Sequence, residues 1–140
     1  FGLTAYTSYT YSNFSYDEYT SNNSDFSGNI LPAIPRNILF QEIRYNHPNG
    51  FNAILNARYV GEMYADDANT IKIDDFTVLN LRIGHEIFMD KWVVSPFLGV
   101  NNLLDVGYYG NIRINAFGGR FYEPAPGINV YGGVKVRFNY

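Results

Sequence analysis

The residues in this chain with side chains suited to catalysis or metal binding are its histidines and its clustered acidic residues. His47 lies in a Pro-Asn-Gly turn and His85 near the end of a strand-like segment, so their spacing supplies neither a metal site nor a catalytic triad. The acidic pairs at residues 66–67 and 74–75 flank one loop, and their oxygens together would suit calcium. Solvated loop acids are the simpler interpretation, and we favour it. We therefore expect no catalytic residues, metal, cofactor or enzymatic activity.

The composition favours strands over helices. Aromatic residues make up 18% of the chain, and they are spread among Asn, Thr, Ser and Gly. This mixture fits strands with one apolar and one polar face bordered by aromatic girdles, although it also fits a soluble β-sandwich. No run approaches the roughly 18 apolar residues that a membrane-spanning helix needs. The net charge of −3 and the scattered Lys and Arg argue against nucleic-acid binding, and the absence of Cys excludes disulfides and thiol chemistry.

Apolar and polar residues alternate along most of the chain, and this period of two predicts β-strands. The alternation is interrupted by Gln41 in the second run, and Pro96 removes a hydrogen-bond donor from the fifth. Each run supplies about the 9–11 residues that a tilted strand needs to cross a bilayer. The sequence predicts six strands, at residues 3–12, 37–46, 51–59, 79–87, 92–101 and 130–138.

The predicted connections alternate in length. Residues 46–50 and 88–91 form short turns, and Asn49-Gly50 suits positive φ. The other three connections are long and rich in Gly, Asn, Asp and Pro, and they cover roughly residues 16–36, 62–75 and 104–128. Short turns at one end and long loops at the other are typical of an outer-membrane barrel, and a soluble sandwich has less reason to sort its loops this way. The fold class expected is all-β, a six-stranded antiparallel up-and-down meander.

Three segments carry a resemblance to a known family. GNILPAIPR at 28–36 resembles the P-x-x-P-R approach to a downward strand in TonB-dependent receptors. GVNNLLD at 99–105 is similar to that family's G-x-x-N-L-F/L-D end of the penultimate strand. FYEPAPG at 121–127, followed by YGGVKVRF at 131–138, resembles its last loop and closing strand. The likeness keeps the order and spacing of the parts along nearly the whole chain.

This resemblance implies a 22-stranded outer-membrane barrel, filled by an N-terminal plug domain, that imports a scarce nutrient with energy from the TonB complex. The nutrient expected from family frequency is a ferric siderophore or similar iron complex. Residues 1–140 would be the C-terminal barrel segment, with the plug, the TonB box and the signal peptide lying elsewhere. We expect membrane lipid as a partner and no transport by the segment alone.

Two sets of residues are candidate functional sites under this resemblance. In this family the barrel assembly machinery recognises the closing strand. The resemblance therefore implies that the recognised residues here are Val134, Val136, Phe138 and Tyr140. An ordinary aromatic girdle is the alternative. The last long loop combines Arg with aromatic rings, which would suit an anionic, catechol-like or ferric chelate ligand, or else the membrane interface. The candidate ligand-contacting residues are Tyr108, Tyr109, Arg113, Arg120 and Tyr122.

Two other functions remain open from the sequence. One is a small outer-membrane barrel or pore that closes by oligomerising, and the other is a soluble β-sheet binding module. Six antiparallel strands leave two open edges, which cannot stay unpaired in hydrocarbon and which invite pairing with another copy in water. We therefore predict that the isolated chain either self-associates edge to edge or folds to cover its apolar face.

Overall fold

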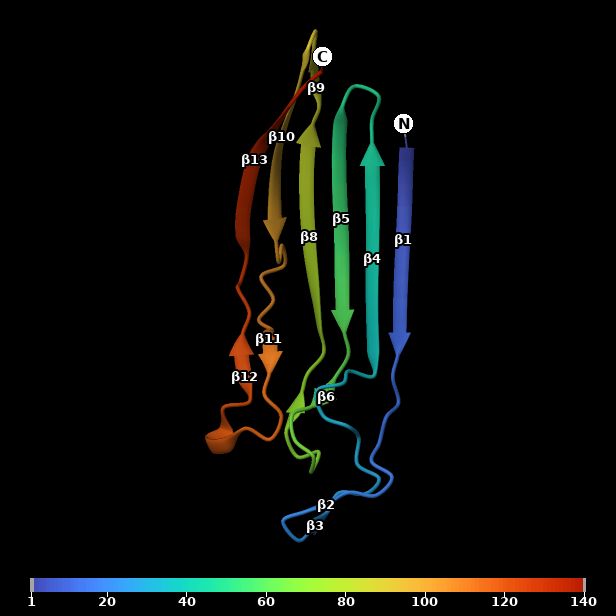
Figure 1. The fold of residues 1–140 in the computed structure, drawn as a ribbon, viewed down its shortest axis with the longest axis vertical. Coiled ribbons are helices and arrows are strands. Elements are labelled where there is room, and N and C mark those ends of the chain that lie inside the picture. Colours follow the sequence, from blue (N-terminus) through green and yellow to red (C-terminus); the bar gives the residue numbers. More distant parts are fainter. Residues whose placement is uncertain (1, 140) are drawn as a thin grey trace.

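The computed structural model describes residues 2–139, and Phe1 and Tyr140 lie outside them. Six long antiparallel strands lie side by side in the order β1-β4-β5-β8-β10-β13, as the sequence predicts (Figure 1). Their bounds are β1 Gly2–Tyr11, β4 Asn37–Asn46, β5 Phe51–Val60, β8 Phe76–His85, β10 Trp92–Asn101 and β13 Asn129–Phe138. No helix in the described part of the chain is long and apolar enough to cross a membrane.

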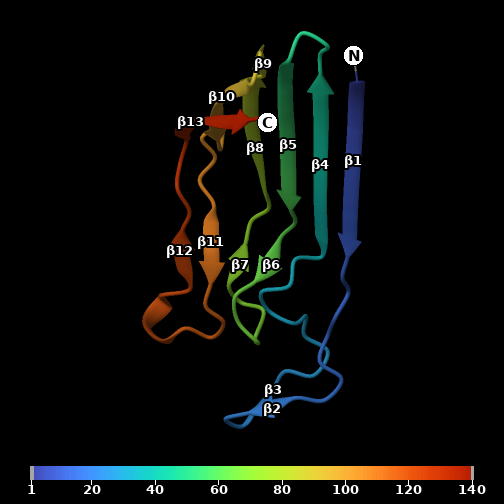
Figure 2. The same ribbon diagram turned by 45° about the horizontal axis from the view of Figure 1, so that its top comes forward.

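The connections are sorted between the two ends of the sheet, as expected. The two short turns lie at one end, together with the start of β1 and the end of β13 (Figure 1). All three long loops lie at the other end, and each contains a small antiparallel pair (Figure 2). These pairs are β2 Thr20–Ser21 with β3 Ser24–Asp25, β6 Met63–Tyr64 with β7 Lys72–Ile73, and β11 Tyr109–Ile112 with β12 Tyr122–Pro124. The last loop also contains the 3₁₀ turn η1 at Phe117–Gly119.

The strand register gives the sheet two chemically different faces. Direct cross-strand partners such as Ile43 and Leu55, or Ile83 and Leu98, share one side, which we call the aliphatic face. Aromatic rings close this face at the short-turn end, where Trp92 lies 4.7 Å from Phe138 between ring centres. Further lipophilic rings occupy the same face at its two ends, namely Tyr45 and Phe51 near the short turns and Tyr9, Tyr11 and Tyr59 near the loops. The opposite face, the polar face, carries the charged strand residues.

Gln41 interrupts the aliphatic face without leaving an unpaired polar group. Its Oε1 accepts a hydrogen bond of 2.5 Å from the hydroxyl of Thr7, its direct partner on β1. Its Nε2 donates to the backbone carbonyl of Glu42 at 3.3 Å. Because an unsatisfied amide in an apolar environment costs several kcal/mol, this pairing explains how the strand tolerates Gln at that position.

Pro96 breaks one ladder of β10 and leaves the other intact. β10 pairs with β13 along its whole length, whereas its pairing with the preceding strand stops at Phe97 and resumes at Val94. Pro has no backbone N–H, so position 96 lacks the donor that would otherwise point toward β8. The chain continues beyond the break as β9, Ile87–Met89, so the turn is shorter than predicted and consists of Asp90 and Lys91.

Two glycine–aromatic pairs join β10 to β13 on the polar face. Phe97 lies directly opposite Gly133, and Tyr131 lies directly opposite Gly99. A Cβ on Gly133 would meet the Phe97 ring at 2.9 Å, and a Cβ on Gly99 would meet the Tyr131 ring at 2.2 Å. Each ring therefore lies over a glycine and fills the space that a side chain would occupy, a pairing that stabilises glycines in strands.

Replacing Gly99 with Ala is expected to destabilise the protein by about 1–3 kcal/mol, because filling an occupied space displaces the ring or the backbone. The collision would be with Cζ of Tyr131. Urea-induced unfolding in lipid bilayers measures the change in free energy.

The control is Gly107→Ala, since nothing lies within 4 Å of a Cβ at that position. Adding Tyr131→Ala to Gly99→Ala removes the collision, so the double variant should lose less stability than the two single changes together. Simple additivity would contradict the proposed ring contact.

Candidate functional site

The three long loops are joined to one another through the middle loop, residues 61–75. Asp67 is 7% exposed, and its carboxylate accepts hydrogen bonds of 2.7 Å from the Tyr16 hydroxyl in the first loop and from Asn115 Nδ2 in the last. Asn115 also accepts a hydrogen bond from the backbone N–H of Asp67, and Asn29 Nδ2 donates to the Asp67 carbonyl. One buried aspartate therefore connects all three loops.

Asp66 shapes the turn that presents Asp67. Its carboxylate accepts hydrogen bonds from the backbone and hydroxyl of Thr70 and from the backbone of Ile71. Burial raises the pKa of Asp66, but these hydrogen bonds together outweigh it and hold the pKa below its ordinary value. The buried acids at 66–67 are therefore internally hydrogen bonded, and the solvated-acid interpretation is wrong for them. Within residues 2–139 no group of three or more potential ligand side chains could hold a metal ion, so the structure does not support the calcium alternative.

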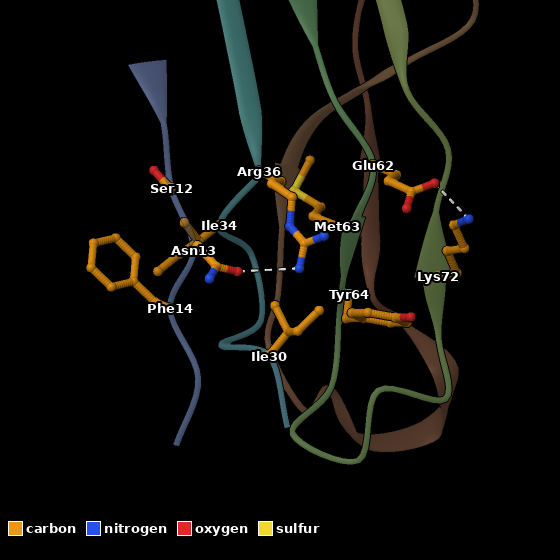
Figure 3. Close-up of a pocket in the computed structure, with 10 residues that line it drawn as sticks. All are labelled: Ser12, Asn13, Phe14, Ile30, Ile34, Arg36, Glu62, Met63, Tyr64 and Lys72. Carbon is orange, nitrogen blue, oxygen red and sulfur yellow. Dashed lines mark hydrogen bonds and ion pairs between the residues drawn. The ribbon is translucent and has the colours of Figure 1, made fainter. Parts of the chain in front are cut away.

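A small cavity lies where the first and middle loops meet (Figure 3). Its volume is about 60 Å³, and Arg36 Nη2 donates to Asn13 Oδ1 at 3.2 Å beside it. Lys72 and Glu62 form an ion pair of 2.6 Å at its other side. Because about 10–15 Å³ of such space is enough to hold one water, this cavity has room for a few water molecules and not for a metal chelate.

A larger cleft lies between the middle and last loops, with a volume of about 400 Å³. We call it the tyrosine cleft. Tyr109 and Tyr122 stack within it at 4.4 Å between ring centres, and Tyr108 packs on Phe76 at 4.9 Å. Its charged lining residues are Lys72, Asp74 and Asp75. The structure thus brings together three of the five residues predicted to contact a ligand, namely Tyr108, Tyr109 and Tyr122.

The other two predicted ligand contacts, Arg113 and Arg120, do not line the tyrosine cleft. Arg113 forms an ion pair with Glu123, and hydrogen bonds from Asn111 and Arg113 lower the pKa of that carboxyl group. Arg120 is exposed next to the 3₁₀ turn. The charged residues of the observed cleft are two carboxylates and one lysine that is paired with Glu62, and the roles of Arg113 and Arg120 stay a prediction.

A family model, TonB dependent receptor-like β-barrel, matches residues 1–103. The chain belongs to this family. A curated relative is the ferrioxamine receptor of Yersinia enterocolitica, which is 27% identical over 111 residues, or 76% of this chain and 15% of that protein.

Solved receptors share the fold. The unliganded ferric citrate transporter FecA has a TM-score of 0.79 and 21% identity over 96% of this chain and 21% of its own. The siderophore receptor PiuA from Acinetobacter baumannii has a TM-score of 0.75 and 20% identity over 99% of this chain and 20% of its own. The chain therefore spans about a fifth or less of the length of these relatives, and identities at this level establish the fold alone.

The structure explains one family motif, the GVNNLLD segment. Asn102 is 1% exposed, has a φ of 50°, and exchanges hydrogen bonds with the backbone N–H and carbonyl of Val106. Asp105 accepts a hydrogen bond of 2.8 Å from the backbone of Ile128, at the far end of the last loop. A Cβ on Gly127 would lie 2.8 Å from that carboxylate, so the glycine of FYEPAPG permits this approach. The motif joins the two ends of the last loop.

The predicted assembly residues Val134, Val136 and Phe138 all lie on the edge strand β13 and are exposed. Register places them on the aliphatic face, with Phe138 against Trp92. Tyr140 lies outside the described residues. The assembly role stays a prediction, and the ring contact is equally compatible with an aromatic girdle.

His47 and His85 belong to neither loop site. The Nδ1 of His47 accepts a hydrogen bond from the backbone of Asn49, which helps to form the short turn. In this turn only Gly50 has a positive φ, although the sequence also suggested it for Asn49. The Nδ1 of His85 is buried without a hydrogen-bond partner in the described structure.

Asp67→Ala is expected to loosen the first and last long loops, because Tyr16 and Asn115 lose the carboxylate that accepts hydrogen bonds from both. The cost of leaving buried partners unsatisfied is about 1–3 kcal/mol. Hydrogen–deuterium exchange should quicken in residues 14–30 and 108–122 while the strands stay protected. Asp17→Ala is the control, since Asp17 is exposed and forms no hydrogen bond in the described part of the chain. Faster exchange confined to residues 61–75 would contradict the link.

The hydrogen bond from Tyr16 to Asp67, which joins the first and middle loops, should be lost at alkaline pH. Burial, the hydrogen bond to Asp67 and its negative charge raise the pKa of Tyr16 from 10.0 to about 12. A raised folded-state pKa means that the stabilisation is complete below pH 10 and is lost as the pH rises through 12. The protection of residues 14–30, taken relative to the intrinsic base-catalysed exchange rate at each pH, should therefore fall across that range. The Tyr16→Phe variant should lack this pH-dependent fall in protection, and an identical fall in the variant would rule out Tyr16 as its source.

Proposed function

We propose that the protein containing this chain is an outer-membrane receptor that imports a ferric siderophore or similar iron complex with energy from TonB. The observation that carries this proposal is the family match over residues 1–103. It is supported by the relatives, which include a ferrioxamine receptor and siderophore receptors. On this proposal the 140 residues contribute six strands to a 22-stranded barrel and do not transport alone.

The two faces of the sheet support a membrane location. The aliphatic face exposes large apolar side chains along most strands, including Leu3, Ile43, Ile83, Leu98 and Val134. A water-soluble sheet would have to cover this face, whereas acyl chains cover it in a bilayer. Aromatic rings at both ends of the same face would lie at the two membrane–water interfaces. We infer that this face contacts outer-membrane lipid and that the long loops are extracellular.

The tyrosine cleft is the proposed ligand-contacting surface of this segment. Its stacked rings offer flat apolar area, and its two carboxylates, Asp74 and Asp75, lie beside a lysine that is already paired with Glu62. Electrostatic complementarity therefore favours a ferric chelate with positive or zero net charge over a polyanionic one. The ion pair between Arg113 and Glu123 lies outside the cleft and does not change this preference.

The transport function is tested by deleting the gene in its own organism. The deletion should abolish growth on one ferric chelate as the iron source, and the intact gene should restore it only when TonB is functional. Unchanged uptake of every ferric chelate tried, across positively charged, neutral and anionic ones, would refute the proposed function.

Tyr109→Ala is expected to weaken binding of the transported chelate about 2- to 10-fold, because an aromatic contact contributes about 0.5–1.5 kcal/mol. Equilibrium binding of the radiolabelled chelate to outer membranes measures the loss. Phe117→Ala is the matched control, since Phe117 is 99% exposed and lies outside the tyrosine cleft. If Phe117→Ala weakened binding and Tyr109→Ala did not, the ligand would contact the tip of the last loop instead of the cleft.

A further inference from the structure

A groove with a volume of about 330 Å³ lies on the aliphatic face, toward the short-turn end of the sheet. Register places its side chains on this face, because Phe51 is the direct partner of His85, and Ile83 is the direct partner of Leu98. We call it the His85 groove. Its lining includes Phe51, Ile83, Pro96 and Leu98, and among the described lining residues only His85 has a polar side chain.

A second histidine lies in the same row across the sheet. His47 donates its backbone N–H to the carbonyl of Phe51 at 2.8 Å, so His47 and His85 flank Phe51 on its two neighbouring strands. The ring of His47 lies 6.2 Å from that of Tyr45, which belongs to the aliphatic face. Because neighbouring strands are about 4.8 Å apart, the backbones of the two histidines are roughly 10 Å apart.

Both imidazoles carry an unused hydrogen-bond donor. The Nδ1 of His47 accepts a hydrogen bond of 3.2 Å from the backbone of Asn49, so its ring proton is on Nε2. The Nδ1 of His85 is buried without a partner in the described structure, and a proton there would have no acceptor, so this ring also carries its proton on Nε2. Within residues 2–139 neither Nε2 has a hydrogen-bond partner.

The position of these donors restricts the ligand. On the proposed function, on which this inference rests, the aliphatic face contacts lipid and the short turns face the periplasm. The groove then opens into the periplasmic leaflet, which consists of glycerophospholipids. Acyl chains alone would leave both Nε2–H donors unpaired, which costs free energy in an apolar environment. A ligand that covers this surface must therefore bring acceptors as well as apolar groups.

A glycerophospholipid has this combination of groups. Its phosphodiester oxygens are charged acceptors, which form stronger hydrogen bonds than neutral ones do. Its acyl chain covers apolar surface, and Ile83 and Leu98 lie one row further from the short turns than His85. We propose that the His85 groove binds one glycerophospholipid, with an acyl chain along Ile83 and Leu98 and its phosphodiester accepting hydrogen bonds from His85 and His47.

Native mass spectrometry of the whole receptor, purified in detergent and titrated with phosphatidylethanolamine, tests this proposal. The receptor should retain one tightly bound lipid. His85→Phe keeps a flat ring and removes the donor, so it should weaken that binding about 10-fold, because a hydrogen bond to a charged group contributes about that much. His47→Phe should weaken it in the same direction. Unchanged affinity in His85→Phe would overturn the proposal.

Tyr11→Phe is the matched control, because it removes one hydroxyl from the same face at the loop end, where Tyr11 is exposed and lies outside the groove. It should leave lipid binding unchanged. Leu98→Trp should release the lipid while both histidines remain, because the larger side chain fills the groove. Retention of the lipid in Leu98→Trp, or an equal loss in Tyr11→Phe, would contradict the proposed site.

Other ligands of the groove give different results. Diacylglycerol has the same chains without the phosphodiester, and binding as tight as that of phosphatidylethanolamine would overturn the role of the histidines. Inorganic phosphate that protects His85 from diethyl pyrocarbonate, with no lipid retained, would indicate a free-anion site instead. Receptor dimers that separate in Leu98→Trp, with no lipid retained, would show that a second copy covers the groove. Either result would overturn the proposal.

The lipid site and the transport function can fail separately. Iron uptake is measured in cells that express the same variants. A retained phospholipid in a receptor that takes up no ferric chelate supports the lipid site and refutes the transport function. Uptake by a receptor that retains no phospholipid refutes the lipid site alone.

Discussion

The structure depends on one constraint, which is that the backbone N–H and C=O groups of the six long strands must be paired. Antiparallel pairing meets this requirement along the interior strands, apart from the break at Pro96. The same register fixes which side chains share a face, because a slip of one residue would exchange the two faces. The edges of β1 and β13 are the positions where one chain cannot meet the requirement by itself, and the larger barrel of the proposed receptor would pair them.

Local exceptions to this constraint are compensated by nearby groups. Pro96 cannot donate toward β8, and the ladder between β10 and β8 breaks there. Glu86, which lies at this break between β8 and β9, donates its backbone N–H to the carbonyl of Gly50 instead. Gln41 puts an amide on the aliphatic face, and Thr7 pairs with it across the strands. Glycines at 99 and 133 weaken their strands, and aromatic rings on the partner strand cover them. Each sequence irregularity thus has a specific structural partner.

The strands could be predicted from the sequence because alternation is a local signal that the tertiary structure preserves. The structure confirms all six, with bounds that shift most at the fourth, where Pro96 on the neighbouring strand splits the pairing into β8 and β9. The contact among the loops could not be predicted, because Tyr16, Asp67 and Asn115 are about 50 residues apart in sequence and follow no repeat. For the same reason, position along the last loop could not predict the lining of the tyrosine cleft, where Asp74 and Asp75 from another loop join the tyrosines.

Charge is also distributed unevenly between the loops and the sheet. Ten of the 13 acidic residues lie in the three long loops, but only four of the ten basic ones do. Five basic residues lie on the polar face of the strands, and only Arg44 among them is ion-paired in the described structure. Because like charges repel and opposite charges attract over about 8–10 Å at physiological ionic strength, one molecule is poorly matched to both surfaces. A cation attracted by the acidic loops would therefore be repelled by the basic polar face of the strands, so the two surfaces favour solutes of opposite charge.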